Sequence, residues 1–227
     1  MIFLRISQFL TWPIAFIYFH LLYSLRVNGR ENLKKISRPF IIIVNHVSFS
    51  DSFLFRLILG FSTPHLPLRF MAVEKFDWRW LNFLSDIGFI PFIYGLFGVF
   101  IVVPGRGLQK NLEEAKRLIS HKQNIVIYPE GKIMIEHRIA PFKHGAAVLA
   151  AETHTPVIPV SLCLGGKMLI RRALTVNIGE PIMVTSDAKT EATVKLFYDT
   201  IAGLHADAKN APLTSGAAIP ASSLVKN

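Results

Sequence analysis

Short apolar runs recur along the chain and alternate with stretches in which apolar residues repeat at helical spacing. Runs of this length predict buried strands, and they cover residues 40–44, 68–73, 99–103, 125–128, 156–160 and 173–178. The helical patterns cover residues 52–60, 78–87, 108–122, 145–152 and 191–206. Strands that alternate with helices in this way predict an α/β fold with a mixed, largely parallel central sheet flanked by helices.

Residues 1–25 are strongly apolar and are interrupted by Arg5, Gln8 and His20. Pro13 is expected to break any single helix in this segment. Residues 9–25 span roughly 25 Å at a rise of about 1.5 Å per residue, which is less than the ~30 Å of a bilayer core. We therefore expect an apolar N-terminal helical membrane anchor, kinked or made of two helices, that lies in one leaflet. A single tilted transmembrane helix is the alternative.

Basic residues follow this segment directly, at Arg26, Arg30, Lys34, Lys35 and Arg38. Clusters of this kind face the cytoplasmic side of a membrane, so we expect membrane association at that face. Residues 26–208 hold the pattern of strands and helices and are expected to form one domain. Residues 209–227 are rich in Ala, Ser and Pro and are expected to be a disordered tail.

Residues 87–103 carry no charge and could be mistaken for a second membrane segment. Glycine and proline are poor residues inside a helix, and this stretch contains Gly88, Pro91, Gly95 and Gly98. We expect an apolar loop that dips toward lipid or walls a cavity for an acyl chain, followed by a strand at 99–103.

The composition narrows the class of partner. The 227 residues are 51% hydrophobic, include 18 Phe and carry a formal net charge of +10. An apolar, basic chain suits an anionic membrane surface. The sequence has no zinc-finger spacing and no basic groove-reading helix, so no nucleic-acid partner is expected. The one cysteine, Cys163, excludes an internal disulfide and is typical of a small core residue, and no Cys/His cluster has the spacing of a metal site.

The apolar run at 40–44 ends in Asn45-His46-Val47-Ser48-Phe49-Ser50-Asp51, where a helix is expected to begin. Residues five apart do not face each other on a regular helix, so the backbone must turn if His46 and Asp51 are to meet. A carboxylate that holds one imidazole nitrogen leaves the other free to accept a proton, which makes His46 a candidate general base. In the structural alternative, Asp51 caps the helix and His46 is a hydrogen-bonded residue at a strand end.

Two further turns follow predicted strands. The run at 99–103 ends in Pro104-Gly105-Arg106-Gly107, and the run at 125–128 ends in Pro129-Glu130-Gly131-Lys132. Ligand sites in open α/β sheets lie at the carboxyl ends of strands, so these turns and the His46 turn are expected to converge on one edge. A solvated surface arginine is the alternative for Arg106.

These motifs resemble those of the glycerolipid acyltransferases of the 1-acylglycerol-3-phosphate acyltransferase type. Four blocks in the family's order carry the resemblance, together with a Phe-Lys-x-Gly element between the last two. They are Asn45, His46 and Asp51; Gly98 to Arg106; Tyr128, Pro129, Glu130 and Gly131; and Val157, Ile158, Pro159 and Val160, with Phe142, Lys143 and Gly145 as the added element. Each block alone is weak, but four in this order are specific.

The resemblance implies an acyltransferase domain at residues 26–208. Its reaction would move a fatty acyl group from an acyl-CoA or acyl carrier protein thioester, the co-substrate, to the free hydroxyl of a lysophospholipid. Lysophosphatidic acid is the first choice of acceptor, with phosphatidic acid as product. His46 and Asp51 would be the catalytic pair, and no metal or further cofactor is expected.

The same resemblance assigns the acceptor site. Arg106, Lys132 and Lys143 are candidates for binding the acceptor phosphate, with Arg106 as the first choice. Glu130 would orient these cations or the glycerol hydroxyls, and backbone N–H groups near Gly131 would hold the oxyanion.

One departure from the family pattern leaves the acceptor open. The third block usually continues with Thr and Arg, where this chain has Lys132 and Ile133. Lys132 keeps a positive charge but lacks the bidentate fork of an arginine. The Glu-Gly-Lys sequence also resembles tafazzin-type transacylases, so an acyltransferase or transacylase acting on another lysolipid is an alternative.

Two alternatives lie outside acyl transfer to lipids. Ser48 or Ser50 could be the nucleophile of a hydrolase, although the Gly-x-Ser-x-Gly elbow is absent. The chain could also be a catalytically silent membrane-binding module, which the intact His46, Asp51 and Glu130 argue against.

Overall fold

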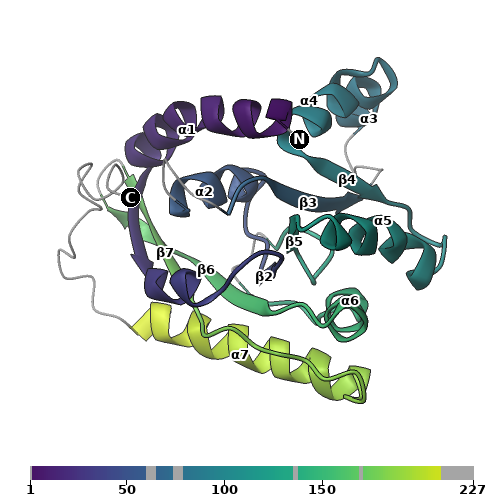
Figure 1. Ribbon diagram of the computed structural model, residues 1–227. Coiled ribbons are helices and arrows are strands. Elements are labelled where there is room, and N and C mark those ends of the chain that lie inside the picture. The colour runs from purple at the N-terminus through teal and green to yellow at the C-terminus, as the bar shows by residue number, and fades with distance from the viewer. Residues whose placement is uncertain (1, 60–64, 74–78, 135–137, 169–170, 211–227) are drawn as a thin grey trace.

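A seven-stranded sheet forms the centre of the protein. The computed structural model describes residues 2–59, 65–73, 79–134, 138–168 and 171–210 (Figure 1). The strands are β1 (Tyr23–Asn28), β2 (Ile41–Val44), β3 (Leu68–Val73), β4 (Val99–Val102), β5 (Asn124–Ile127), β6 (Val157–Met168) and β7 (Arg171–Ile178). Their order across the sheet is β1-β7-β6-β2-β5-β3-β4. All neighbours are parallel except β6 and β7, so the predicted mixed, largely parallel sheet is confirmed.

Helices cover both faces of this sheet. They are α1 (Ile2–Leu22), α2 (Asp51–Ile58), α3 (Arg79–Asp86), α4 (Phe89–Phe97), α5 (Leu108–Ser120), α6 (Gly145–Thr153) and α7 (Thr190–Asn210), with a 3₁₀ helix at Arg30–Lys35. Ile42 and Val44 of β2 pack in one core with α1 and α2, whereas Ile41 and Ile43 pack in another with α5, α6 and α7 (Figure 1). Because both faces are covered, the central strand β2 is apolar and buried at every position rather than alternating.

Helix α1 is continuous from Ile2 to Leu22, so the expectation that Pro13 would break it is wrong. A proline removes one N–H from the helical ladder, but the buried face of α1 anchors the helix on both sides of this position. The buried residues, each 5% exposed or less, are Leu4, Gln8, Ala15 and Phe19. Packing of these side chains therefore outweighs the missing hydrogen bond.

Gln8 ties α1 to three other elements. Its amide nitrogen donates to the carbonyls of Leu68 (2.8 Å) and Phe97 (3.0 Å), and its side-chain oxygen accepts from the Leu68 N–H (3.1 Å). Its backbone carbonyl accepts from Nε of Arg56 on α2 (2.7 Å). Burial lowers the pKa of Arg56 to about 10. The apolar N-terminal helix is thus joined to β3, to the end of α4 and to α2.

The outer face of α1 is apolar and exposed. Six of its large side chains are between 51% and 67% exposed, and they are Phe3, Ile6, Leu10, Ile14, Ile17 and Leu21. Among the helices of the described residues, none combines the length and hydropathy that a bilayer crossing requires.

Residues 89–97 form helix α4, so the prediction of an apolar loop there is wrong. Gly88 and Gly98 lie just outside the helix with φ of 81° and 74°, in the left-handed region that glycine adopts at helix ends. Pro91 lies in the first turn, where N–H groups have no intrahelical acceptor, so its missing donor costs little. Gly95 alone of the four stands in the helix interior.

Strand β1 has no counterpart among the predicted strands. It lies at one edge of the sheet, parallel to β7, with Leu25 opposite Leu174. The predicted boundary between residues 25 and 26 falls inside it. Leu25 is its one buried residue, so the segment contains no apolar run that would mark a strand.

The remaining predicted elements are present with shifted ends. The helix predicted at 78–87 is α3, and residue 78 lies outside the described residues. Strand β6 extends to Met168, well past the predicted end at residue 160, because it pairs along its length with β7. Of the predicted tail, residues 209 and 210 complete α7, and residues 211–227 lie outside the described residues.

Candidate active site

The turn after β2 begins with a buried asparagine that holds on to the sheet through its side chain. Asn45 is 2% exposed. Its side-chain nitrogen donates to the carbonyl of Leu162 on β6 (2.9 Å), and its side-chain oxygen accepts from the Leu162 N–H (2.7 Å). The side chain thus continues the pairing with β6 while the backbone leaves the sheet, which frees the next residue, His46, to face the strand edge.

His46 and Asp51 meet across this turn, as predicted. Nδ1 of His46 lies 2.9 Å from Oδ2 of Asp51. The same oxygen accepts from the backbone N–H groups of Val47 (2.8 Å) and Ser48 (2.9 Å). Since an ionised carboxylate can only accept, Nδ1 carries the proton and Nε2 is left as the basic nitrogen. Asp51 is the first residue of α2, so the helix N-terminus also favours its negative charge.

Tyr128, which follows β5, packs its ring against the imidazole. The two rings are stacked, with centroids 4.0 Å apart and an interplanar angle of 23°. Tyr128 is partly buried, and its hydroxyl lies 3.2 Å from the hydroxyl of Ser52 on α2. Burial, and next the nearby Asp51 carboxylate, raise the pKa of Tyr128 well above its ordinary value, so it is a neutral phenol. This contact was not foreseen from the sequence.

Glu130 holds the backbone of the same turn. It is 3% exposed. One carboxylate oxygen accepts from the His46 N–H (3.0 Å), and the other accepts from the Ala140 N–H (3.0 Å). The His46 carbonyl in turn accepts from the Met134 N–H (2.8 Å). Burial raises the pKa of the Glu130 carboxyl, while these backbone donors oppose the rise. In the described contacts Glu130 therefore shapes the loop, and the predicted role toward acceptor hydroxyls stays a prediction.

Lys143 lies against the backbone of Gly131. Gly131 has φ of 68°, and a Cβ placed on it would come 2.8 Å from Cε of Lys143 and closer still to its amine. The Lys143 N–H also donates to the Pro129 carbonyl (2.9 Å). The N–H of Gly131 is already bonded to the Tyr128 carbonyl (3.0 Å), so this group is not free to hold an oxyanion. The structure thus brings the Lys143 amine to the Glu130-Gly131 loop.

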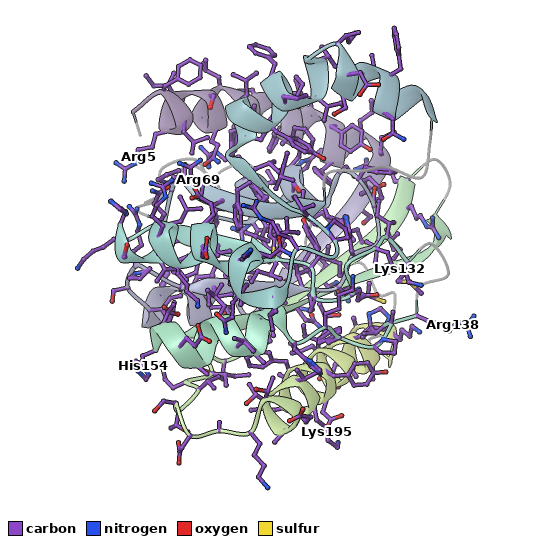
Figure 2. All side chains as sticks on the ribbon, turned by 90° about the vertical axis from the view of Figure 1, so that its right-hand side faces the viewer. Arg5, Arg69, Lys132, Arg138, His154 and Lys195 are labelled. Carbon is purple, nitrogen blue, oxygen red and sulfur yellow. The ribbon has the colours of Figure 1, made fainter. Side chains whose placement is uncertain are left out.

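Lys132 is exposed and lies at the same edge of the sheet. Figure 2 places Lys132 and Arg138 on one side of the molecule and Arg5 and Arg69 on the other. Arg69 lies near the start of β3 and Lys132 follows the end of β5, as expected for the two ends of parallel strands. Cations therefore lie at both edges, and only some of them lie at the edge that carries His46.

Arg106 lies on an exposed turn between β4 and α5. It lines an open depression whose described lining is Ile101, Arg106, Lys110, Asn111, Glu113, Glu114 and Arg117. These residues all belong to β4, the turn and α5. Strand β4 is three places from β2 in the sheet order, a lateral distance of roughly 14 Å at about 4.8 Å per strand. Arg106 shares the carboxyl edge with His46 but not its immediate surroundings.

Within the described residues, no group of three or more His, Cys, Asp or Glu side chains is arranged to hold a metal ion. The hydroxyls of Ser48 and Ser50 lie 3.0 Å from each other. In the same turn, Nδ1 of His46 bonds the side chain of Asp51.

Comparisons with known proteins match the chain to acyltransferases. A family model described as Acyltransferase matches residues 24–163. The chain is 29% identical over 154 residues to the chloroplastic 1-acyl-sn-glycerol-3-phosphate acyltransferase BAT2 of Brassica napus, covering 65% of this chain and 39% of that protein. It is 29% identical over 143 residues to the human 1-acyl-sn-glycerol-3-phosphate acyltransferase beta, covering 63% of this chain and 48% of that protein. The chain thus spans less than half the length of these relatives.

A solved structure shares the fold. The crystal structure of the 1-acyl-sn-glycerophosphate acyltransferase PlsC from Thermotoga maritima superposes with a TM-score of 0.62, covering 92% of this chain and 81% of that one. The identity is 21%, so this match shows the shared fold alone.

Proposed function

Because this chain belongs to the Acyltransferase family, we propose that it transfers a fatty acyl group from a thioester to the free hydroxyl of a lysophospholipid. Lysophosphatidic acid, which becomes phosphatidic acid, is the acceptor that the names of the relatives favour. The observation that carries the proposal is the 2.9 Å contact between His46 and Asp51 at the carboxyl edge of the sheet. That contact leaves one imidazole nitrogen basic and free of the carboxylate.

In the proposed reaction, Nε2 of neutral His46 removes the acceptor's hydroxyl proton while the oxygen attacks the thioester carbonyl carbon. Asp51 stabilises the imidazolium that forms. The tetrahedral intermediate then expels the thiolate, which takes the proton from the imidazolium, and the ester is complete. General base catalysis of this kind typically contributes about 10²–10⁴-fold.

Lys143 is better placed than Arg106 to meet the acceptor phosphate. In lysophosphatidic acid acylated at the first carbon, the free hydroxyl and the phosphate ester are on adjacent carbons, so both groups bind close to His46. The Lys143 amine lies on Gly131, beside the loop that bonds His46. Arg106 would have to reach across β3 and β5 to the same phosphate. Lys143 is also a possible donor to the oxyanion, since the Gly131 N–H is already bonded.

The membrane is the proposed source of the acceptor. The exposed apolar face of α1 continues onto α4, which lies beside it, and onto α3, which packs against α4 (Figure 1). On these two helices and the link between them, Phe83, Ile87, Phe89 and Phe92 are each at least 51% exposed. A surface of this kind, on a chain with a net charge of +10, is suited to lie in one leaflet of an anionic membrane.

The Lys132-Ile133 sequence favours a second candidate, acyl transfer to a lysolipid other than lysophosphatidic acid. The exposed Lys132 offers a point charge next to Ile133, which stands where the family usually has the bidentate fork of an arginine. The hydroxyls of Ser48 and Ser50 contact each other and not the imidazole, which argues against a serine nucleophile and hence against the hydrolase alternative.

A screen of acceptors tests the proposal. Purified protein in phospholipid vesicles is given acyl-CoA or acyl carrier protein thioesters and a panel of lysolipids, and the products are identified by mass. We expect phosphatidic acid to form, His46→Ala to abolish it, and binding to anionic vesicles to be unchanged in that variant. Full turnover by His46→Ala would remove His46 from the mechanism. Vesicle binding without turnover of any acceptor would leave a membrane-binding module.

A further inference from the structure

We propose that Tyr128 is a positioning residue whose ring fixes the plane of the His46 imidazole. This inference rests on the proposed function, since it assigns Tyr128 a part in the general-base step. The argument starts from what Asp51 alone can do. One hydrogen bond to Nδ1, at 2.9 Å, sets the tautomer and one point of the ring, but it permits the ring to tilt about that point.

The Tyr128 ring removes this freedom. It lies nearly parallel to the imidazole, with centroids 4.0 Å apart and planes inclined by 23°. At this spacing the rings are in van der Waals contact over their faces, so a tilt of the imidazole about its bond to Asp51 would meet the phenol ring on that side. Offset stacking thereby limits the direction in which Nε2 points.

Tyr128 is itself fixed on both ends. Its backbone leaves β5 at the sheet edge, and its carbonyl accepts from the Gly131 N–H (3.0 Å). Its hydroxyl lies 3.2 Å from the Ser52 hydroxyl, and Ser52 is the residue after Asp51 on α2. His46, Asp51, Ser52 and Tyr128 therefore form a closed circuit in which the carboxylate and the phenol are held by neighbouring positions of one helix.

The phenol hydroxyl supplies a contact that a plain aromatic ring would lack. The hydroxyl joins the β5 loop to α2, and burial keeps it protonated through the working pH range. A phenylalanine would keep the stacked face and lose the link to Ser52. A leucine would lose both.

Steady-state kinetics on the full chain in vesicles test the proposal, with lysophosphatidic acid and a saturating thioester. We expect Tyr128→Leu to lower kcat by about 10–100-fold, within the range of general base catalysis, while KM for both substrates stays within about threefold of wild type. Tyr128→Phe and Ser52→Ala are each expected to lower kcat by about threefold, and the double variant no further, because both remove the same hydrogen bond.

Tyr198→Leu is the matched control. Tyr198 is a half-buried tyrosine on α7 whose ring contacts Phe142, with centroids 5.4 Å apart, and not His46. We expect this variant to keep the kcat of wild type. Equal losses in Tyr198→Leu and Tyr128→Leu would show that loss of buried aromatic volume, rather than the stack, lowers the rate, and would overturn the proposal.

Nitrogen-15 NMR of histidine-labelled protein provides a readout independent of turnover. The His46 Nδ1 proton is expected to exchange with solvent more than tenfold faster in Tyr128→Leu than in wild type, with Tyr128→Phe in between. An unchanged exchange rate, or a rise in KM in place of a fall in kcat, would overturn the proposal. If Tyr128→Leu does not fold, Tyr128→Met replaces it in the same assays. The comparison of Tyr128→Phe, Ser52→Ala and their double variant then tests the proposal by the same criteria. If the proposed function fails instead, the wild-type protein transfers no acyl group. The order of the His46 Nδ1 exchange rates in wild type, Tyr128→Phe and Tyr128→Leu is then still as expected.

Discussion

Replacement of Asp51 by asparagine separates the charge of this residue from its geometry. Oδ2 of Asp51 accepts from the Val47 and Ser48 N–H groups as well as from His46. An asparagine must place its oxygen at this position, because an NH₂ group there would face two donors. The amide oxygen therefore still accepts from Nδ1, the tautomer is kept, and Asp51→Asn removes mainly the negative charge.

The size of the effect follows from the distance. Nδ1 and Oδ2 are 2.9 Å apart, which puts the centres of an imidazolium and a carboxylate roughly 4 Å apart. At an effective dielectric of about 20 this attraction is about 4 kcal/mol, or about 10³-fold in rate. The two backbone donors already spread the carboxylate charge, so this is an upper value. We expect kcat of Asp51→Asn to fall by about 10²–10³-fold with KM unchanged.

Asp51→Ala is the matched comparison, because it also leaves the Val47 and Ser48 N–H groups without their acceptor. Unpaired donors cost about 1–3 kcal/mol each when buried, so we expect the unfolding free energy of Asp51→Ala to fall by about 2–4 kcal/mol and that of Asp51→Asn by less than about 1 kcal/mol. The assays are initial rates at saturating thioester and urea unfolding of both variants. Asp51→Asn turnover within about threefold of wild type would refute the electrostatic role.

Three further predictions concern the surroundings of the pair. Asn45→Leu leaves both backbone groups of Leu162 unpaired, so urea unfolding should show a loss of about 2–4 kcal/mol; a smaller loss than about 0.5 kcal/mol would contradict this. Gly131→Ala adds a Cβ at φ of 68°, against Lys143, and should raise KM for lysophosphatidic acid more than KM for the thioester. Equal changes in the two KM values would contradict a role of Lys143 in binding the acceptor. The folded state holds the Tyr128 proton more tightly than the unfolded chain, whose tyrosines lose theirs near pH 10, so stability should fall as pH rises above about 10. Tyr128→Phe should flatten that slope in denaturation between about pH 9 and 11, and an unchanged slope would assign it to other groups.

The sequence predicted the elements whose signal is local. The run at 40–44 and its neighbours are unbroken because helices cover both faces of the central strands, and short runs of this kind predict buried strands. The meeting of His46 with Asp51 was also predictable, since the serines between them are residue types that turn a chain. The lateral position of each turn along the sheet edge was not predictable. The turn after β4 shares the edge with His46 but lies three strands away from it.

Most of the errors arise from contacts between distant parts of the chain. Strand β1 buries one side chain and depends on β7 for its hydrogen bonds. The error at α4 is local: glycine disfavours a helix interior, but Gly88 and Gly98 lie at the two boundaries of the helix. Asn45 pairs with a residue 117 positions away, and Tyr128 with an imidazole in the turn that follows β2. Nothing in the spacing of these residues reveals their partners.

The Gln8 contacts have a practical consequence for trimming the protein. A deletion variant that starts after residue 22 would remove the apolar helix α1. It would also open the layer that Ala15 and Phe19 fill above β2, and would deprive the buried Arg56 guanidinium of the Gln8 carbonyl. Since Arg56 stands on the helix that begins with Asp51, such a deletion would disturb the very residue that sets the imidazole. Polar substitutions on the outward positions of α1, such as Leu10 or Ile17, are the safer route to solubility.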